Sequence, residues 1–230
     1  MSESHVLIII PAFNAVKFIE ECALSIQAQT YTSWRGVIVD DGSSDGTFEA
    51  ATALAKMDSR WSAIRKANGG APSAVNVALL DLSPAVWAVA FCDSDDLWLP
   101  LKLEKQVAIA HKQRAGQAVW AIGTLMEEFN SFQVDSPRSH TARPGSHKHF
   151  CRTNALLSRE LIENLGPMDE DVRYMDFVHW ISPALRGGVE PLFVKEVLTR
   201  RRVHENNMTA KPDKQKYLEF LRNHMRSGQM

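Results

Sequence analysis

Short apolar runs alternate with amphipathic stretches through the first half of the chain. Four of these runs are predicted to be strands, at residues 6–10, 36–39, 62–66 and 86–92. The first and the last are almost uninterrupted, as in parallel strands that are buried on both faces. Helices are predicted between and after them, at residues 18–26, 47–56, 73–80 and 101–113. This alternation predicts an α/β domain whose mostly parallel sheet is covered by helices on both faces.

The regular alternation ends after residue 113. A strand is expected over 118–125, but residues 127–149 show no steady period and are rich in Arg, Lys and His. Farther on, Ser158 is expected to cap a short helix that ends at Gly166. The remaining predicted elements are a helix around 177–185, one or two strands over 192–203 and a helix around 217–224. We therefore divide one domain into two regions, residues 1–113 and a smaller mixed region of residues 114–230.

Composition places the chain among ordinary globular proteins. Its 26 Lys and Arg nearly balance 27 Asp and Glu, so no overall charge favours binding to nucleic acid. The three cysteines lie far apart, without the paired spacing of a zinc site. No apolar run approaches the roughly 20 residues of a transmembrane helix, and the polar start lacks a signal-peptide pattern. We expect a cytoplasmic protein, and association with a membrane surface stays open.

Three carboxylates follow the fourth apolar run within four residues, in Asp93-Ser94-Asp95-Asp96. Carboxylates this close repel one another unless a cation lies among them. Oxygen ligands suit Mg²⁺ or Mn²⁺, which commonly bind through one or two carboxylates and the phosphates of a substrate. Asp40 and Asp41 end the second run, and parallel strands open their ligand sites on one edge. The two clusters predict a metal–diphosphate site, and the alternative is an acidic turn that only caps the next helix.

Glycine-rich phosphate-binding patterns do not occur in the sequence. Neither GxGxxG nor GxxxxGK[ST] is found, so a dinucleotide fold or a P-loop is not indicated. Phosphate is therefore expected to be held through a metal rather than in a glycine-rich loop.

Five blocks of the first half resemble the family 2 glycosyltransferases. They are Ile8–Asn14, Ser25–Thr30, Val39–Thr47, Asn68–Gly70 and Asp93–Trp98, in that family's order and at its spacing across residues 5–113. The resemblance implies a GT-A fold, a nucleotide-sugar donor, a divalent cation and inversion at the anomeric carbon of the sugar. Residues 1–113 would then bind the nucleotide sugar, and residues 114–230 would lie on the acceptor side.

The resemblance also implies roles for individual residues. Pro11 and Phe13 would line the nucleobase pocket, and Asp41 would bond the base. Asp93 would lie toward the ribose, and Asp95 would be the metal ligand, with Mn²⁺ or Mg²⁺ as the cofactor. The whole donor-binding set that it implies is Pro11, Phe13, Asn14, Asp41, Asn68, Gly69, Asp93, Asp95 and Arg202.

The second half matches the family more loosely. In Met175-Asp176-Phe177-Val178-His179-Trp180, Asp176 would be the general base that takes the proton from an acceptor hydroxyl. Such a base is typically worth about 10²–10⁴-fold in rate. Met175 stands where the family usually has Glu, which removes a charge beside the proposed base. The alternative is that Asp176 is an ordinary carboxylate at a helix start.

Residues 202–207 resemble the family's Arg-x-His-x-Asn segment. His204 would bind the metal or contact the diphosphate, and Arg202 would balance phosphate charge. The alternative is that His204 is a surface group. A second departure from the family is Val75, in Val75-Asn76-Val77-Ala78, where an arginine is common.

These residues together predict a metal-assisted, inverting glycosyltransferase. It would move a sugar from a nucleotide-diphosphate sugar, with uridine as the favoured base, to a hydroxyl of a carbohydrate or another acceptor. Two alternatives stay open: a nucleotide-sugar-binding protein that has lost catalysis, suggested by Met175 and Val75, and a sugar nucleotidyltransferase. The basic segment 127–149 is expected to face the acceptor. Little chain follows Asp176, so help from a second subunit, as in a homo-oligomer, or from another protein also stays open.

Overall fold

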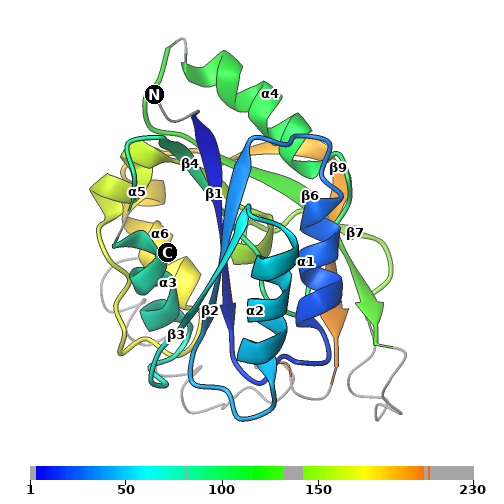
Figure 1. The fold of residues 1–230 in the computed structure, drawn as a ribbon. Coiled ribbons are helices and arrows are strands. Elements are labelled where there is room, and N and C mark those ends of the chain that lie inside the picture. The colour runs from blue at the N-terminus through cyan, green and yellow to red at the C-terminus, as the bar shows by residue number, and fades with distance from the viewer. Residues whose placement is uncertain (1–3, 81, 115, 132–141, 205–206, 208–230) are drawn as a thin grey trace.

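The computed structural model describes residues 4–80, 82–114, 116–131, 142–204 and 207. Its strands are β1 (His5–Ala12), β2 (Trp34–Asp40), β3 (Trp61–Arg65), β4 (Val86–Phe91), β5 (Leu97–Trp98), β6 (Ala121–Asn130), β7 (Ser146–His147), β8 (Leu156–Ser158) and β9 (Leu192–Val203). They form one sheet in the order β3-β2-β1-β4-β8-β6-β9-β5, and β7 pairs with β6 (Figure 1). β3, β2, β1 and β4 are parallel, whereas β8 and β5 run antiparallel to their neighbours.

Helices cover both faces of this sheet, as the alternation predicts (Figure 1). They are α1 (Ile19–Gln27), α2 (Thr47–Met57), α3 (Ala71–Leu79), α4 (Lys102–Arg114), α5 (Arg159–Leu165) and α6 (Asp176–Arg186), with a 3₁₀ turn, η2, at Arg152–Asn154. On β1, Ile8 and Ile10 point to a core shared with α1, α2 and α4. Ile9 points to the opposite core, which is shared with α3, α5 and α6. Alternate residues of one strand thus bury both layers.

The acidic segment requires the sheet to curl. Four strand spacings separate β4 from β5, about 19 Å if the sheet were flat. The connection from Phe91 to Leu97 spans six peptide steps, at most about 20 Å when fully extended. It is not extended, because the Asp96 N–H donates to the Asp93 carbonyl (3.0 Å) in a tight turn. The far strands must therefore bend back toward β4, and α1 packs directly against β5.

In the second half of the chain, local sequence patterns predicted some helices and strands and missed others. Ser158 caps α5 as predicted, because its Oγ accepts the Leu161 N–H (3.2 Å), and the helix ends at Gly166. The strand predicted over 118–125 begins at Ala121 and runs on to Asn130, held by β9. The prediction missed β5, which consists of two residues and shows no periodicity. The helix predicted around 217–224 lies outside the described residues.

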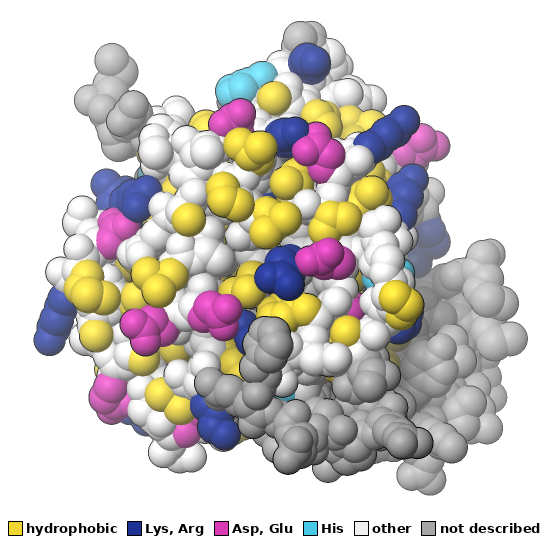
Figure 2. All heavy atoms as spheres, turned by 90° about the vertical axis from the view of Figure 1, so that its right-hand side faces the viewer, with side chains coloured by type: hydrophobic (Ala, Val, Ile, Leu, Met, Phe, Trp, Pro, Cys, Tyr) yellow, Lys and Arg dark blue, Asp and Glu magenta, His cyan; other side chains and the backbone are white. Residues whose placement is uncertain are grey.

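Surface charge agrees with the balanced composition. On the side of β7 and β9, acidic and basic side chains are interspersed with small apolar groups, and neither sign of charge dominates (Figure 2). Among the described residues, no helix combines the length and the apolar character that crossing a membrane requires.

Candidate active site

The two acidic clusters lie at the same edge of the sheet. β2 ends at Asp40 and β4 ends at Phe91, just before Asp93, and β1 pairs in parallel with both. The carboxyl end of β1, with Pro11, therefore lies between the clusters. This is the edge where open α/β sheets bind their ligands.

Asp41 organises the loop that follows β3. Its Oδ1 accepts hydrogen bonds from the Gly69 N–H (2.9 Å) and from Lys66 Nζ (2.8 Å), and its Oδ2 accepts from the Gly70 N–H (2.7 Å). The Asn68 side-chain amide donates to the Asp41 carbonyl (2.9 Å). Of the predicted donor-binding residues, Asp41, Asn68 and Gly69 are thus brought together.

The end of β1 is tied to the loop after β2. Asn14 adopts a left-handed conformation (φ 49°), its N–H donates to Ser43 Oγ (2.9 Å) and its Oδ1 accepts the Ser44 N–H (3.0 Å). Pro11 is buried within the strand, whereas Phe13 is 53% exposed. A large aromatic side chain that stays exposed beside a polar loop is available for contact with a flat ligand.

Asp95 and His204 come together from distant segments of the chain. His204 Nε2 lies 2.9 Å from Asp95 Oδ2, and the Asn207 side-chain amide donates to the same oxygen (3.0 Å). The imidazole packs against Phe18, with 4.7 Å between ring centroids. His204 is 6% exposed, which excludes its interpretation as a surface group.

The donor set of this pair fits a cation that is shared with a substrate. Carboxylate oxygens suit Mg²⁺ or Mn²⁺, and the imidazole adds a nitrogen ligand. Within the described ranges, no three His, Cys, Asp or Glu side chains gather in a group able to hold an ion. A cation at Asp95 and His204 would therefore need further ligands from phosphate oxygens, as is common for Mg²⁺.

Arg202 holds the acidic turn in place. The backbone N–H of Arg202 donates to Asp96 Oδ1 (2.9 Å). Its side chain donates from Nε to the Asp95 carbonyl (2.8 Å), and Nη2 pairs with Glu21. Because Arg202 lies in β9 and the acidic turn follows β4, these contacts connect two strands that are not neighbours in the sheet.

A residue that sequence analysis did not identify connects the two ends of the site. Arg152, in the turn before β8, donates from Nε to Asp93 Oδ1 (2.6 Å) and from Nη1 to Asp176 Oδ2 (2.7 Å). Its side chain is only 9% exposed. No motif or spacing marks Arg152 in the sequence, because the contact joins three segments that are far apart along the chain.

Burial and charge act in opposite directions in this cluster. Burial raises the pKa of Asp93, and the Arg152 guanidinium opposes that rise. Burial would lower the pKa of Arg152, but Asp93 and Asp176 outweigh it and raise that pKa above its ordinary value. Burial, with Asp95 and Asp93 nearby, raises the pKa of Asp96 well above the usual range. Arg152 therefore stays charged and is the cation that balances the inner carboxylates.

Asp176 begins α6 in an unusual backbone setting. The preceding residue, Met175, has a left-handed conformation (φ 51°), which is uncommon for a side chain of this size. Asp176 Oδ1 accepts the N–H of Phe177 (2.8 Å), while Oδ2 accepts from Arg152. A carboxylate oxygen has two lone pairs, so each oxygen can still accept one more hydrogen bond.

Val75, the position at which the family commonly has arginine, lies on α3, is fully buried and packs in the core between that helix and the sheet. A cation nevertheless reaches this stretch of the edge from another segment. A Cβ added at Gly70, whose φ is +89°, would lie 2.4 Å from Arg173 Nη1. The Arg173 guanidinium thus lies against the backbone at Gly70, in the loop after β3 that Asp41 holds.

Comparison with known proteins identifies the family of this chain. The sequence model described as "Glycosyl transferase family 2" matches residues 7–166, more than half of the chain. The chain belongs to this family. A relative from Bacillus subtilis (strain 168), named "Putative teichuronic acid biosynthesis glycosyltransferase TuaG", is 40% identical over 214 residues, covering 89% of this chain and 81% of the relative.

Two solved glycosyltransferase structures share the fold of this family 2 chain. S. aureus TarS 1-349 in complex with UDP-GlcNAc aligns with a TM-score of 0.69 at 17% identity, over 88% of this chain and 60% of that one. Mannosyltransferase PcManGT from Pyrobaculum calidifontis, in complex with GDP-Man and Mn²⁺, aligns with a TM-score of 0.67 at 24% identity, over 90% and 59%. The chain thus spans about three fifths of these two proteins. The expected GT-A fold is confirmed.

Proposed function

We propose that the chain transfers a sugar from a nucleotide-diphosphate sugar, with uridine as the base, to an acceptor hydroxyl with inversion. The observation that carries this proposal is the cluster Asp93–Arg152–Asp176, which holds a candidate donor-binding carboxylate and a candidate base on one guanidinium. The complexes of the structural neighbours with UDP-GlcNAc and with GDP-Man support a nucleotide-sugar donor.

In this proposal the donor lies along the edge formed by β2, β1 and β4. Phe13 contacts the base, Asp41 and the backbone around Gly69 bond it, and Asp93 bonds the ribose. Asp176 takes the proton from the acceptor hydroxyl while the oxygen of that hydroxyl attacks the anomeric carbon. The bond from the anomeric carbon to the diphosphate breaks. Attack from the face opposite the leaving group inverts the configuration at that carbon.

Asp95 and His204 would hold Mn²⁺ or Mg²⁺ together with the diphosphate. The cation, when bound, acts as a Lewis acid that stabilises negative charge on the leaving group. The Mn²⁺ in the complex of PcManGT supports this assignment. Asn207 and Arg202 contribute by fixing the Asp95 side chain and carbonyl, respectively.

The deciding experiment separates binding from turnover. The protein is incubated with Mn²⁺ and a panel of nucleotide sugars, and released nucleoside diphosphate is measured. We expect slow hydrolysis of one donor in the wild type. In Asp176→Asn, affinity for that donor should persist while turnover falls by about 10²–10⁴-fold. An Asp176→Asn protein with wild-type turnover would refute the role of Asp176 as the base.

The same assay tests the two alternatives. Release of pyrophosphate would identify a nucleotidyltransferase. Donor binding without turnover would identify a binding protein, the outcome suggested by Met175 at the position of the family's Glu.

A further inference from the structure

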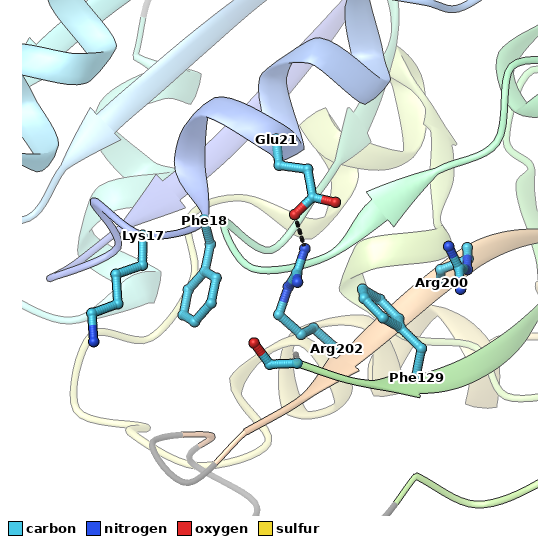
Figure 3. Close-up of a pocket in the computed structure, with 7 residues that line it drawn as sticks. Lys17, Phe18, Glu21, Phe129, Arg200 and Arg202 are labelled. Carbon is cyan, nitrogen blue, oxygen red and sulfur yellow. Dashed lines mark hydrogen bonds and ion pairs between the residues drawn. The ribbon is translucent and has the colours of Figure 1, made fainter. Parts of the chain in front are cut away.

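A pocket opens beside the acidic turn. It has a volume of about 180 Å³ and is lined by Lys17, Phe18, Glu21, Phe129, Ser131, Arg200 and Arg202 (Figure 3). One wall comes from the start of α1, and the other comes from the ends of β6 and β9. Pockets for whole small-molecule ligands usually measure about 300–1,000 Å³. This pocket therefore suits one ring or one anionic group and not a complete nucleotide sugar.

The lining carries three cations and one carboxylate. Arg202 pairs with Glu21, and the other two cations of the lining are Lys17 and Arg200. Arg200 is held by Glu127, which lies outside the lining (2.7 Å). Among the described residues, Lys17 has no carboxylate partner, and its side chain is exposed. The net charge of the lining favours an anion.

The two arginines are fixed in position by an aromatic ring. The guanidinium carbons of Arg200 and Arg202 lie 4.5 Å and 4.6 Å from the centroid of Phe129, and that of Arg202 lies 5.1 Å from Phe18. Together with the contacts of Arg202 to the acidic turn, this stacking orients the guanidinium groups before any ligand binds. Preorganised arginines with apolar faces beside them suit an anion attached to a ring.

A buried hydroxyl supplies an independent sign of a ligand. Ser131 is 5% exposed, and its Oγ has no hydrogen-bond partner within the described residues. Buried polar groups are nearly always hydrogen-bonded, so an unpaired one in a pocket wall indicates a missing partner. A hydroxyl can donate to an oxyanion that the neighbouring cations attract.

We propose that this pocket binds the phosphate of a phosphorylated saccharide, the acceptor of the transfer reaction. Lys17, Arg200 and Ser131 bind the phosphate oxygens, and Phe18 and Phe129 contact the attached sugar ring. The identification of this ligand as the acceptor rests on the proposed function. Arg202 forms the wall between the pocket and the acidic turn, so a ligand held here lies next to the proposed metal site.

The test measures binding rather than turnover. N-Acetylglucosamine 1-phosphate is titrated into the ¹⁵N-labelled chain of 230 residues that is saturated with UDP and Mg²⁺, and amide shifts give the dissociation constant. We expect binding that weakens with added salt, and at least tenfold weaker binding of uncharged N-acetylglucosamine. Lys17→Glu should weaken binding of the sugar phosphate at least tenfold, and Ser131→Ala about threefold or more. Lys56→Glu, a reversal at an exposed lysine on α2, is the matched control and should change it less than twofold.

Three outcomes would overturn the proposal. If the sugar phosphate bound only when UDP was left out, the site would belong to the donor. If Lys17→Glu bound the probe as tightly as the wild type, the pocket would not be the site. If inorganic phosphate bound as tightly as the sugar phosphate, the pocket would bind free phosphate and not an acceptor. Failure of the proposed function would appear as absent donor binding or turnover, a result separate from these three.

Discussion

Replacing Arg152 with methionine should destabilise the fold and disable the site together. The substitution keeps the unbranched stem of the side chain but leaves two carboxylates without their cation. Breaking a buried ion pair by removing one partner typically costs about 3–5 kcal/mol, because a buried charge is left uncompensated. Asp176 is 11% exposed and stays buried, whereas Asp93 is 34% exposed and regains some hydration. We therefore expect the lower end, about 3 kcal/mol.

Urea unfolding at pH 7.5, followed by circular dichroism, measures this loss directly. For a chain of 230 residues, each kcal/mol corresponds to about 2–4 °C in melting temperature, so Arg152→Met should melt roughly 6–12 °C lower. Arg152→Lys keeps the charge without the planar fork and should lose less. Combining Arg152→Met with Asp176→Asn removes one of the two uncompensated carboxylates. The double variant should therefore lose less free energy of unfolding than the sum of the two single losses.

An Arg152→Met protein whose free energy of unfolding stayed within about 0.5 kcal/mol of the wild type, an ordinary range for surface changes, would show that the two carboxylates need no buried cation. Additive losses in the double variant would show that Arg152 and Asp176 do not interact.

Two further substitutions test the core and a turn. Burial lowers the pKa of Lys102 from 10.5 to about 7. Between these values the unfolded state binds more protons, so the stability of the wild type should rise with pH by up to about 1.4 kcal/mol per unit. In Lys102→Met this dependence on pH is absent, so the stability of the variant relative to the wild type should be highest below pH 7 and decline toward pH 10.5. Urea unfolding at pH 6.5, 8 and 9.5 measures both proteins. Equal changes of unfolding free energy with pH in the two proteins would contradict the expectation. Gly42 has a φ of +78°, and Gly42→Ala places a Cβ 2.9 Å from the backbone nitrogen of Asn68. This substitution should lower the free energy of unfolding, measured by thermal unfolding, by about 1–3 kcal/mol. Gly116→Ala, which meets nothing within 4 Å, is its control, and equal melting of the two would refute the steric argument.

The sequence predicted those regions of the fold in which local pattern and burial agree. Uninterrupted apolar runs predicted β1 and β4, and a serine just before an amphipathic stretch predicted the helix cap at Ser158. The meeting of the two acidic clusters followed from parallel pairing alone. β5 could not be predicted, because two residues have no period and their partner in β9 lies about 100 residues farther along the chain.

The site could be predicted only as far as its motifs extend. The pairing of Asp95 with His204 was suggested by two separate motifs, whereas the bridge from Asp93 to Asp176 depends on Arg152, which belongs to no motif. A buried cation is selected by the charges around it in space, and nothing local in the sequence records them. The roles of these residues in donor binding and catalysis stay predictions for the experiments above.

The curl of the sheet has a consequence for any attempt to split the enzyme. The acidic turn is covalently joined to the first 113 residues, yet the strand that follows it is hydrogen-bonded to β9 near the end of the described chain. A fragment ending before β6 would carry the acidic turn without the strand that fixes its far side. The remaining fragment would present long strand edges with nothing to pair them. The acidic turn and the strands that hold it are therefore indivisible, and a gene fusion or permutation would have to keep both fragments in one assembled fold.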